Sequence, residues 1–196
     1  MRKVIRDDFD KFHDYNLFMP ARTIYYGSMA EEWDGVEAGV DYISTSNLIK
    51  NLIILDNISQ EPITIYMNTP GGDWYHGIAL YDLIIGIRAP VTIVCLGWIM
   101  SMGTIILQAA NKRVLLPNCG FMIHDGKEGY IGETKNFEAW AEEAKYTRKK
   151  MYQIYLHRIK QKHPRFTIAQ VEKLCLHDRF LRPERAVELN LADMVA

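Results

Sequence analysis

The hydrophobic positions of the chain follow two different spacings, and the two spacings alternate along the sequence. Short apolar runs that are typical of buried strands occupy residues 22–26, 62–67, 91–96, 112–116 and 121–124. Apolar residues recur at helical spacing over residues 45–55, 76–88 and 102–111. Strands that alternate with helices in this way form crossover units, so we expect an α/β fold with a mostly parallel sheet covered by helices.

The last third of the chain is dominated by one long amphipathic segment. From Phe137 to Ile159 the apolar residues form a single stripe among many Glu and Lys residues, which predicts a long helix. Periodicity alone allows this helix either to close the core of its own domain or to pack as an arm on a partner. Two short helices are predicted after it, one opened by a capping box at Thr167 and one with Pro183 at its first position.

The segments without a clear pattern lie near the N-terminus. Residues 1–20 are mixed and charged, and we expect an arm or a loop there; residues 29–43 are acidic and predict a loop. The helix that follows has two candidate N-caps, Ser44 and Ser46. A chain of 196 residues suits one α/β domain, so we divide it into an N-terminal arm at 1–21 and a single domain at 22–196.

The composition narrows the classes of function. A formal net charge of −1 offers no general attraction for nucleic acid or acidic membranes, and we expect the chain to bind neither. No apolar stretch reaches the ~20 residues of a membrane span. The charged N-terminus is not followed by an apolar segment, so we expect no secretory signal there. The three cysteines, Cys95, Cys119 and Cys175, have apolar neighbours and predict buried thiols in a reducing cytoplasm.

Ser101 is the best candidate for a nucleophile. Of the five serines in the chain, it alone lies between glycines at a junction between a predicted strand and a predicted helix, in Gly97-Trp-Ile-Met-Ser-Met-Gly103. Such a turn raises the hydroxyl above the sheet and directs N–H groups of the helix start toward a reacting group.

A serine hydroxyl needs a base, usually a histidine that is oriented by a carboxylate. His124 is the best of the six histidines, because it ends the predicted strand 121–124 and so lies at the same edge of a parallel sheet as Ser101. The carboxylate is left between two residues. Asp125 adjoins His124 but points to the opposite side of an extended chain, whereas Asp178 lies in a loop and is slightly favoured.

A second feature suits acyl transfer. The Pro70-Gly71-Gly72 turn allows a backbone N–H to approach a reacting carbonyl oxygen closely, so the N–H groups of Gly72 and Met102 could form an oxyanion hole. An ordinary tight turn is the alternative. We find no spacing typical of a zinc site, and we expect no metal or other cofactor.

Taken together, residues 60–196 resemble the ClpP family, the proteolytic subunits of Clp proteases. The segments that carry the resemblance occur in the order of the family: Tyr66-Met-Asn-Thr-Pro-Gly-Gly72, Gly97-Trp-Ile-Met-Ser-Met-Gly103, Leu116-Pro-Asn-Cys-Gly-Phe-Met-Ile-His124, Asp178-Arg-Phe-Leu and Ala186-Val-Glu-Leu-Asn-Leu-Ala-Asp193. The resemblance implies a ClpP-like (crotonase-type) fold of repeated ββα units, with Ser101 as nucleophile, His124 as base and Asp178 as the orienting acid. It also implies that Gly72 and Met102 supply the oxyanion hole.

The resemblance further implies an assembly. Residues 125–160 look like the family's handle, a strand and a long helix that interlock two heptameric rings into a tetradecamer with an inner chamber. Unfolded polypeptides, supplied by an AAA+ unfoldase, bind there as an added β-strand. The expected activity is therefore that of a serine endopeptidase. A non-catalytic ring subunit and a crotonase-fold acyl-CoA enzyme are the alternatives, and the filled Ser, His and Asp positions argue against both.

Several positions depart from the family. Asp125-Gly126 replaces the usual Gln-Pro after the histidine, His177 replaces Arg, and Arg182 replaces Ser. The first third of the chain matches poorly, and in the family this region forms axial loops and part of the unfoldase dock. The sequence therefore leaves the identity of the unfoldase open.

Overall fold

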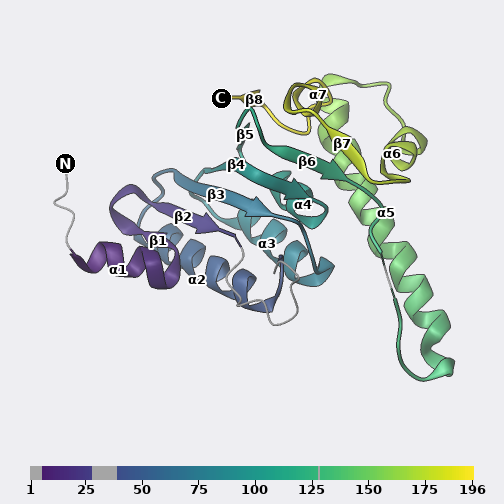
Figure 1. Ribbon diagram of the computed structural model, residues 1–196, viewed down its shortest axis with the longest axis horizontal. Coiled ribbons are helices and arrows are strands. Elements are labelled where there is room, and N and C mark those ends of the chain that lie inside the picture. Colours follow the sequence, from purple (N-terminus) through teal and green to yellow (C-terminus); the bar gives the residue numbers. More distant parts are fainter. Residues whose placement is uncertain (1–5, 28–38, 128) are drawn as a thin grey trace.

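A computed structural model of the chain describes residues 6–27, 39–127 and 129–196. Within these residues eight strands form one sheet with the order β1-β2-β3-β4-β5-β8, and β6 pairs with both β4 and β7 (Figure 1). The parallel strands are β2 (Thr23–Tyr26), β3 (Ile63–Thr69), β4 (Val91–Met100), β5 (Lys112–Leu115), β6 (Gly120–Ile123) and β8 (Met194–Val195). The antiparallel strands are β1 (Leu17–Phe18), beside β2, and β7 (Arg179–Leu181), beside β6. The prediction of a mostly parallel α/β sheet is confirmed.

The strand β4 continues beyond the end that its apolar run predicts. Instead of stopping at Leu96, it passes through Gly97 in a left-handed conformation with φ +60° and runs on to Met100. The Asn68 side chain accepts a hydrogen bond from the Trp98 N–H at 2.8 Å and so fixes the backbone of β4 directly after Gly97. Before Gly97 the strand pairs with β5, and after it the strand pairs with β6. This exchange of neighbours brings β6 beside the end of β4.

The helices are α1 (Arg6–Tyr15), α2 (Tyr42–Ile58), α3 (Trp74–Gly86), α4 (Met102–Leu107), α5 (Phe137–Lys162), α6 (Ile168–Cys175) and α7 (Pro183–Glu188), with 3-10 turns η1 (Met19–Ala21) and η2 (Thr134–Asn136). None of the helices in the described parts of the chain has the length and apolar character that a membrane span requires.

Three details of the helices refine or differ from the sequence prediction. Within the segment expected as an arm or a loop, residues 6–15 form the helix α1. The structure describes only the end of the loop predicted at 29–43. The N-cap of α2 is Asp41, not Ser44 or Ser46, because the Asp41 carboxylate accepts the Ser44 N–H at 2.8 Å and the Ser44 hydroxyl accepts the Asp41 N–H in return. The helix α4 ends at Leu107 rather than at Asn111.

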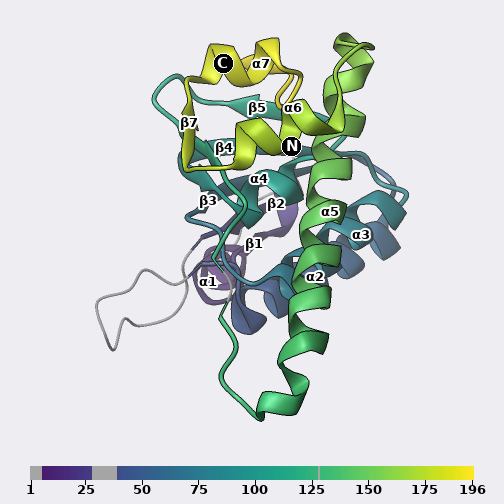
Figure 2. The same ribbon diagram turned by 90° about the vertical axis from the view of Figure 1, so that its right-hand side faces the viewer.

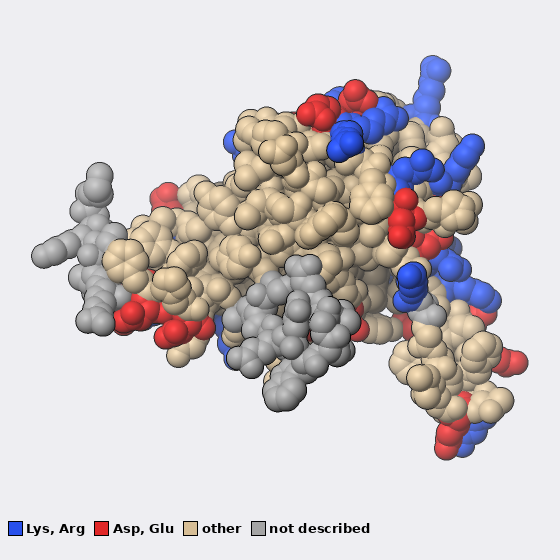
Figure 3. Space-filling model, viewed as in Figure 1, with Lys and Arg blue, Asp and Glu red and all other residues tan. Residues whose placement is uncertain are grey.

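The helices α2, α3, α4 and α5 lie on the same side of the sheet (Figures 1 and 2). Residues along β3 alternate between buried and more exposed positions, which is the pattern of a strand with one covered face. On the other face the side chains of Tyr66, Trp98 and Phe180 are exposed, and Figure 3 shows few charged residues over the centre of that face. The helix cover that the sequence predicts is therefore one-sided within the described chain.

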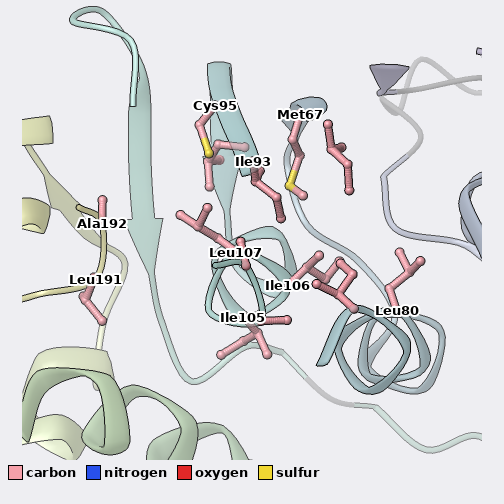
Figure 4. Packing of buried hydrophobic residues seen from close by; sticks show 14 of the residues in the cluster. Met67, Leu80, Ile93, Cys95, Ile105, Ile106, Leu107, Leu191 and Ala192 are labelled. Atoms are coloured by element: carbon pink, nitrogen blue, oxygen red, sulfur yellow. The ribbon is translucent and has the colours of Figure 1, made fainter. Parts of the chain in front are cut away.

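The core lies between the sheet and these helices. All residues of α4 are buried. Ile106 lies on the side of α4 toward Leu80 of α3, and Leu107 on the side toward Ile93 and Cys95 of β4 (Figure 4). Each fully buried Leu or Ile side chain contributes about 1.5–3 kcal/mol through removal of apolar surface from water. Since α4 begins directly after Ser101, this packing fixes the position of the serine.

The long helix α5 has two different halves. Its second half is part of the core, where Met151, Tyr155 and Ile159 are buried, so there the structure agrees with the first of the two alternatives, a helix that closes its own domain. Its first half projects from the body of the molecule, and the side chains of Phe137 and Trp140 are more than half exposed (Figures 1 and 2). The described residues between β6 and η2 form no strand, so the structure supplies the helix of the expected handle and not its strand.

A buried arginine ties the C-terminal segment to the sheet. Arg113 of β5 is almost fully buried and forms an ion pair with Asp193, while its guanidinium also donates to the Gln108 side chain and the Asn190 carbonyl. Burial acts to raise the pKa of Asp193, but the hydrogen bonds and the charge of Arg113 outweigh it and lower that pKa. The Asp193 carboxylate therefore favours the folded state as long as it is ionised.

Asp193→Asn should lower the free energy of unfolding by about 1–2 kcal/mol at pH 7, since a charge-assisted contact to a buried guanidinium is lost. Because the pKa of Asp193 is lower in the folded than in the unfolded chain, this contribution is present above pH ~4 and is lost as the pH falls through the folded value. Urea denaturation of both chains at pH 7 and at acidic pH measures the effect, with exposed Asp10→Asn as the control. A difference in stability that is independent of pH would contradict this account.

Candidate active site

Ser101 occupies a strained turn between β4 and α4. Its φ of 49° and ψ of −123° are unusual for a residue with a side chain, and the surrounding contacts impose them. The Ser101 N–H donates to the Met122 carbonyl of β6 at 2.9 Å, and the Ser101 carbonyl accepts from both the backbone N–H and the hydroxyl of Thr104. The turn is the strand-to-helix junction that the sequence predicts.

The structure places His124 and Asp178 in line with this serine. The Ser101 Oγ lies 2.8 Å from His124 Nε2, and His124 Nδ1 lies 2.8 Å from Asp178 Oδ1. The antiparallel pairing of β6 with β7 explains this arrangement, because Ile123 lies opposite Arg179 and the next residues outward are His124 and Asp178. The imidazole is mostly buried, whereas the Asp178 side chain remains 60% exposed.

Asp125, the other candidate carboxylate, points away from His124 toward α5. Its side chain accepts a hydrogen bond from the Tyr152 hydroxyl at 2.6 Å, and its N–H donates to the Cys175 carbonyl at 2.7 Å. Burial, the hydrogen bond to Asp125 and the Asp125 charge together raise the pKa of Tyr152, so the phenol keeps its proton and remains a donor. The alternation of side chains along an extended segment therefore selects Asp178 as the partner of His124.

Among the described residues that line this site there is no cysteine, so no thiol competes with Ser101 there. The sulfur of Cys175 lies in the core, where burial and, secondarily, the Asp125 charge raise its pKa to about 12. A thiol with such a pKa holds its proton at neutral pH and is a poor nucleophile.

The glycine turn lies against the serine. A side chain at Gly71, which has φ +98°, would place its Cβ 2.5 Å from the Ser101 Cβ and 3.0 Å from the Met102 nitrogen. Val40 donates to the Gly71 carbonyl at 2.7 Å and accepts from the Asp73 N–H at 2.8 Å, which leaves the N–H of the intervening Gly72 directed away from Val40. The Met102 N–H is the first of α4 and has no acceptor within its own helix. Both amides are thus suited to receive an anion.

These residues line one cleft between the edge of the sheet and α5, with a volume of about 930 Å³. The lining includes Gly72, Ser101, Met102, His124 and Asp178, which are all five of the site residues that the sequence predicts. All six histidines lie in the described chain, and His124 is the one that lines this cleft.

The sequence prediction misses the far wall of the cleft. This wall comes largely from α5, and its apolar members are Phe137, Trp140, Ala141, Ala144 and Met151. These residues belong to the apolar stripe over residues 137–159. An apolar stripe alone does not distinguish the wall of a cleft from a buried core.

A mostly parallel α/β sheet that carries a serine, a histidine and an aspartate in one hydrogen-bonded line has the arrangement of a serine hydrolase. Comparison with known proteins agrees with this class, since residues 29–196 match the family described as Clp protease. The chain is also 33% identical over 184 residues to the ATP-dependent Clp protease proteolytic subunit of Deinococcus radiodurans, covering 92% of this chain and 83% of the relative. The chain belongs to the Clp protease family.

Gly71→Ala should lower the rate at which a fluorophosphonate labels the protein by about 100-fold or more. The added methyl group meets Ser101 and the backbone of Met100 and Met102, and a shift of about 1 Å in a reacting group has an effect of this size. Gly86→Ala is the control, because its Cβ would meet open space at the end of α3 and labelling should not change. Equal labelling of the two variants would show that Gly71 does not constrain the serine.

Proposed function

We propose that the chain is a serine endopeptidase subunit of a Clp-type protease and that Ser101, His124 and Asp178 form its catalytic triad. The observation that carries the proposal is the pair of 2.8 Å contacts that joins the three side chains in one line. Membership of the Clp protease family supports peptidase activity, and the geometry supports the serine mechanism.

In this mechanism His124 Nε2 takes the proton of the Ser101 hydroxyl as Oγ attacks the carbonyl carbon of the scissile peptide bond. Asp178 accepts a hydrogen bond from His124 Nδ1, fixes the tautomer and stabilises the imidazolium. The oxyanion is stabilised by the N–H groups of Gly72 and Met102. The His124 proton then passes to the leaving amine, and water hydrolyses the acyl-enzyme through the same base.

The substrate that fits this cleft is an unfolded polypeptide. Next to the serine, Gly72 forms a parallel bridge with Val40, so the backbone here already pairs main chain to main chain, which suits pairing with an added strand. The cleft walls are largely apolar, with Trp74, Met102 and Ile105 on one side and α5 on the other, which suits apolar side chains.

We further propose that the active form is a pair of stacked heptameric rings served by an AAA+ unfoldase. The relative from Deinococcus radiodurans is named as the proteolytic subunit of an ATP-dependent protease. The exposed apolar residues at the start of α5 and in the segment before it, including Ile131, Phe137 and Trp140, suit contact with a second ring. The three free, buried cysteines fit a reducing cytoplasm.

A fluorophosphonate probe should label the wild-type chain and not Ser101→Ala, because the probe reacts with an activated serine. His124→Ala and Asp178→Ala should lower peptide hydrolysis by several orders of magnitude, as removal of a triad member does. Labelled-peptide mass spectrometry and hydrolysis of a short fluorogenic peptide provide the measurements.

Ser59→Ala is the control for the labelling experiment, since Ser59 lies at the far end of α2. Folded wild-type protein that is neither labelled nor active would favour a non-catalytic ring subunit. Near-normal activity of Asp178→Ala would remove Asp178 from the triad and leave the peptidase proposal standing.

Light scattering should report a particle far larger than the 22.7 kDa chain. If the handle joins two rings, the double variant Phe137→Ser, Trp140→Ser should reduce the particle mass to about half, because it removes apolar surface from the exposed start of α5. Tyr15→Ser, at an exposed aromatic residue of α1, is the matched control. A monomeric wild type would contradict the assembly.

A further inference from the structure

A buried chain of hydrogen bonds joins α5 to the backbone of Ser101. The Thr104 hydroxyl lies 2.6 Å from the Ser101 carbonyl oxygen and 2.5 Å from the Tyr155 hydroxyl. Both side chains are almost fully enclosed, with 0% of Thr104 and 1% of Tyr155 exposed. The catalytic steps described above use neither residue.

The direction of the chain follows from the hydrogens available. A threonine hydroxyl has one hydrogen, and that hydrogen goes to the Ser101 carbonyl. The Tyr155 hydroxyl must then donate to Thr104 Oγ1. Burial raises the pKa of Tyr155 well above its ordinary value, so the phenol keeps its proton at neutral pH and remains a donor.

The Ser101 carbonyl belongs to the same peptide unit as the Met102 N–H. This unit is planar and trans, since the structure has no cis peptide bond in the described residues, so its carbonyl and its N–H point in opposite directions. A contact that fixes one of them therefore fixes the other. The Thr104 backbone N–H also donates to the Ser101 carbonyl, at 2.9 Å, and the hydroxyl adds a second donor from the side chain.

We propose that Thr104 and Tyr155 are positioning residues that set the direction of the Met102 N–H as an oxyanion donor. The inference rests on the proposed function, because it assigns a role within that mechanism. The unusual φ and ψ of Ser101 require support from its surroundings, and these two hydroxyl groups supply part of it from outside the turn. Their effect is on the transition state, where the oxyanion exists, and not on binding of the substrate.

Thr104→Val keeps the shape of the side chain and removes the hydroxyl. We expect kcat per active site to fall about 10-fold with KM changed less than twofold, which is smaller than the effect of losing an oxyanion donor outright. The Ki of a peptide boronate, whose tetrahedral adduct places an oxygen in the oxyanion hole, should rise in proportion. Thr104→Ser, which keeps the hydroxyl, should restore most of kcat. Fluorophosphonate titration gives the number of active sites.

Tyr155→Phe tests the outer donor and preserves the aromatic ring in the core. It should lower kcat about two- to threefold in the wild-type background and have no further effect in Thr104→Val, because the two hydroxyl groups act through one contact. Thr45→Val, at a buried threonine of α2, is the matched control and should leave kcat per site unchanged.

The inference is overturned if Thr104→Val retains kcat per site within twofold of the wild type, or if Tyr155→Phe lowers kcat equally in both backgrounds. A fall in the number of titrated sites with unchanged kcat per site would also overturn it, since that result indicates a purely structural role. Failure of the proposed function is distinguished by the wild type itself, which would then be neither labelled nor active.

Discussion

The antiparallel pairing of β6 with β7 is the constraint on which the site depends. Ile123 opposite Arg179 brings His124 beside Asp178, although the two residues are far apart in the sequence. The same strand β6 accepts the Ser101 N–H through Met122, so the serine, the histidine and the aspartate are all positioned by one strand. β6 in turn reaches the end of β4 only because β4 changes its neighbour after Gly97.

The parts of the fold that follow from the sequence are those with long, regular patterns. The five apolar runs form strands, and Ser101 and His124 lie at the strand ends that their context predicts. The sequence does not predict the strand β7, because its three residues carry too little pattern. Without β7 the sequence favours Asp178 only slightly over Asp125. The sequence does not distinguish Asp41 from Ser44 as the N-cap of α2, because both residue types are common at helix starts. In the structure Ser44 is the third residue of the helix and forms a capping box with Asp41.

The helix α5 shows why periodicity gives an incomplete account of a long helix. One apolar stripe serves the core at Ile159 and a cleft wall at Ala144, and at Trp140 it both lines the cleft and is exposed to solvent. A sequence pattern shows that a residue is apolar and lies on the apolar face of a helix. It does not show whether that face packs on the core, lines a cleft or contacts solvent. Tyr155 was part of the same stripe, and only the structure reveals that its hydroxyl faces Thr104.

The uncovered face of the sheet affects the solubility of a subunit that has not assembled. Tyr66, Trp98 and Phe180 lie on it with few charges nearby, and such a surface promotes aggregation while it is in contact with water. Charged residues on an exposed face oppose such association, and few of them lie over the centre of this face in the described part of the chain. A chain that stands alone exposes this face to water, so we expect its tendency to aggregate to rise with the concentration of monomer.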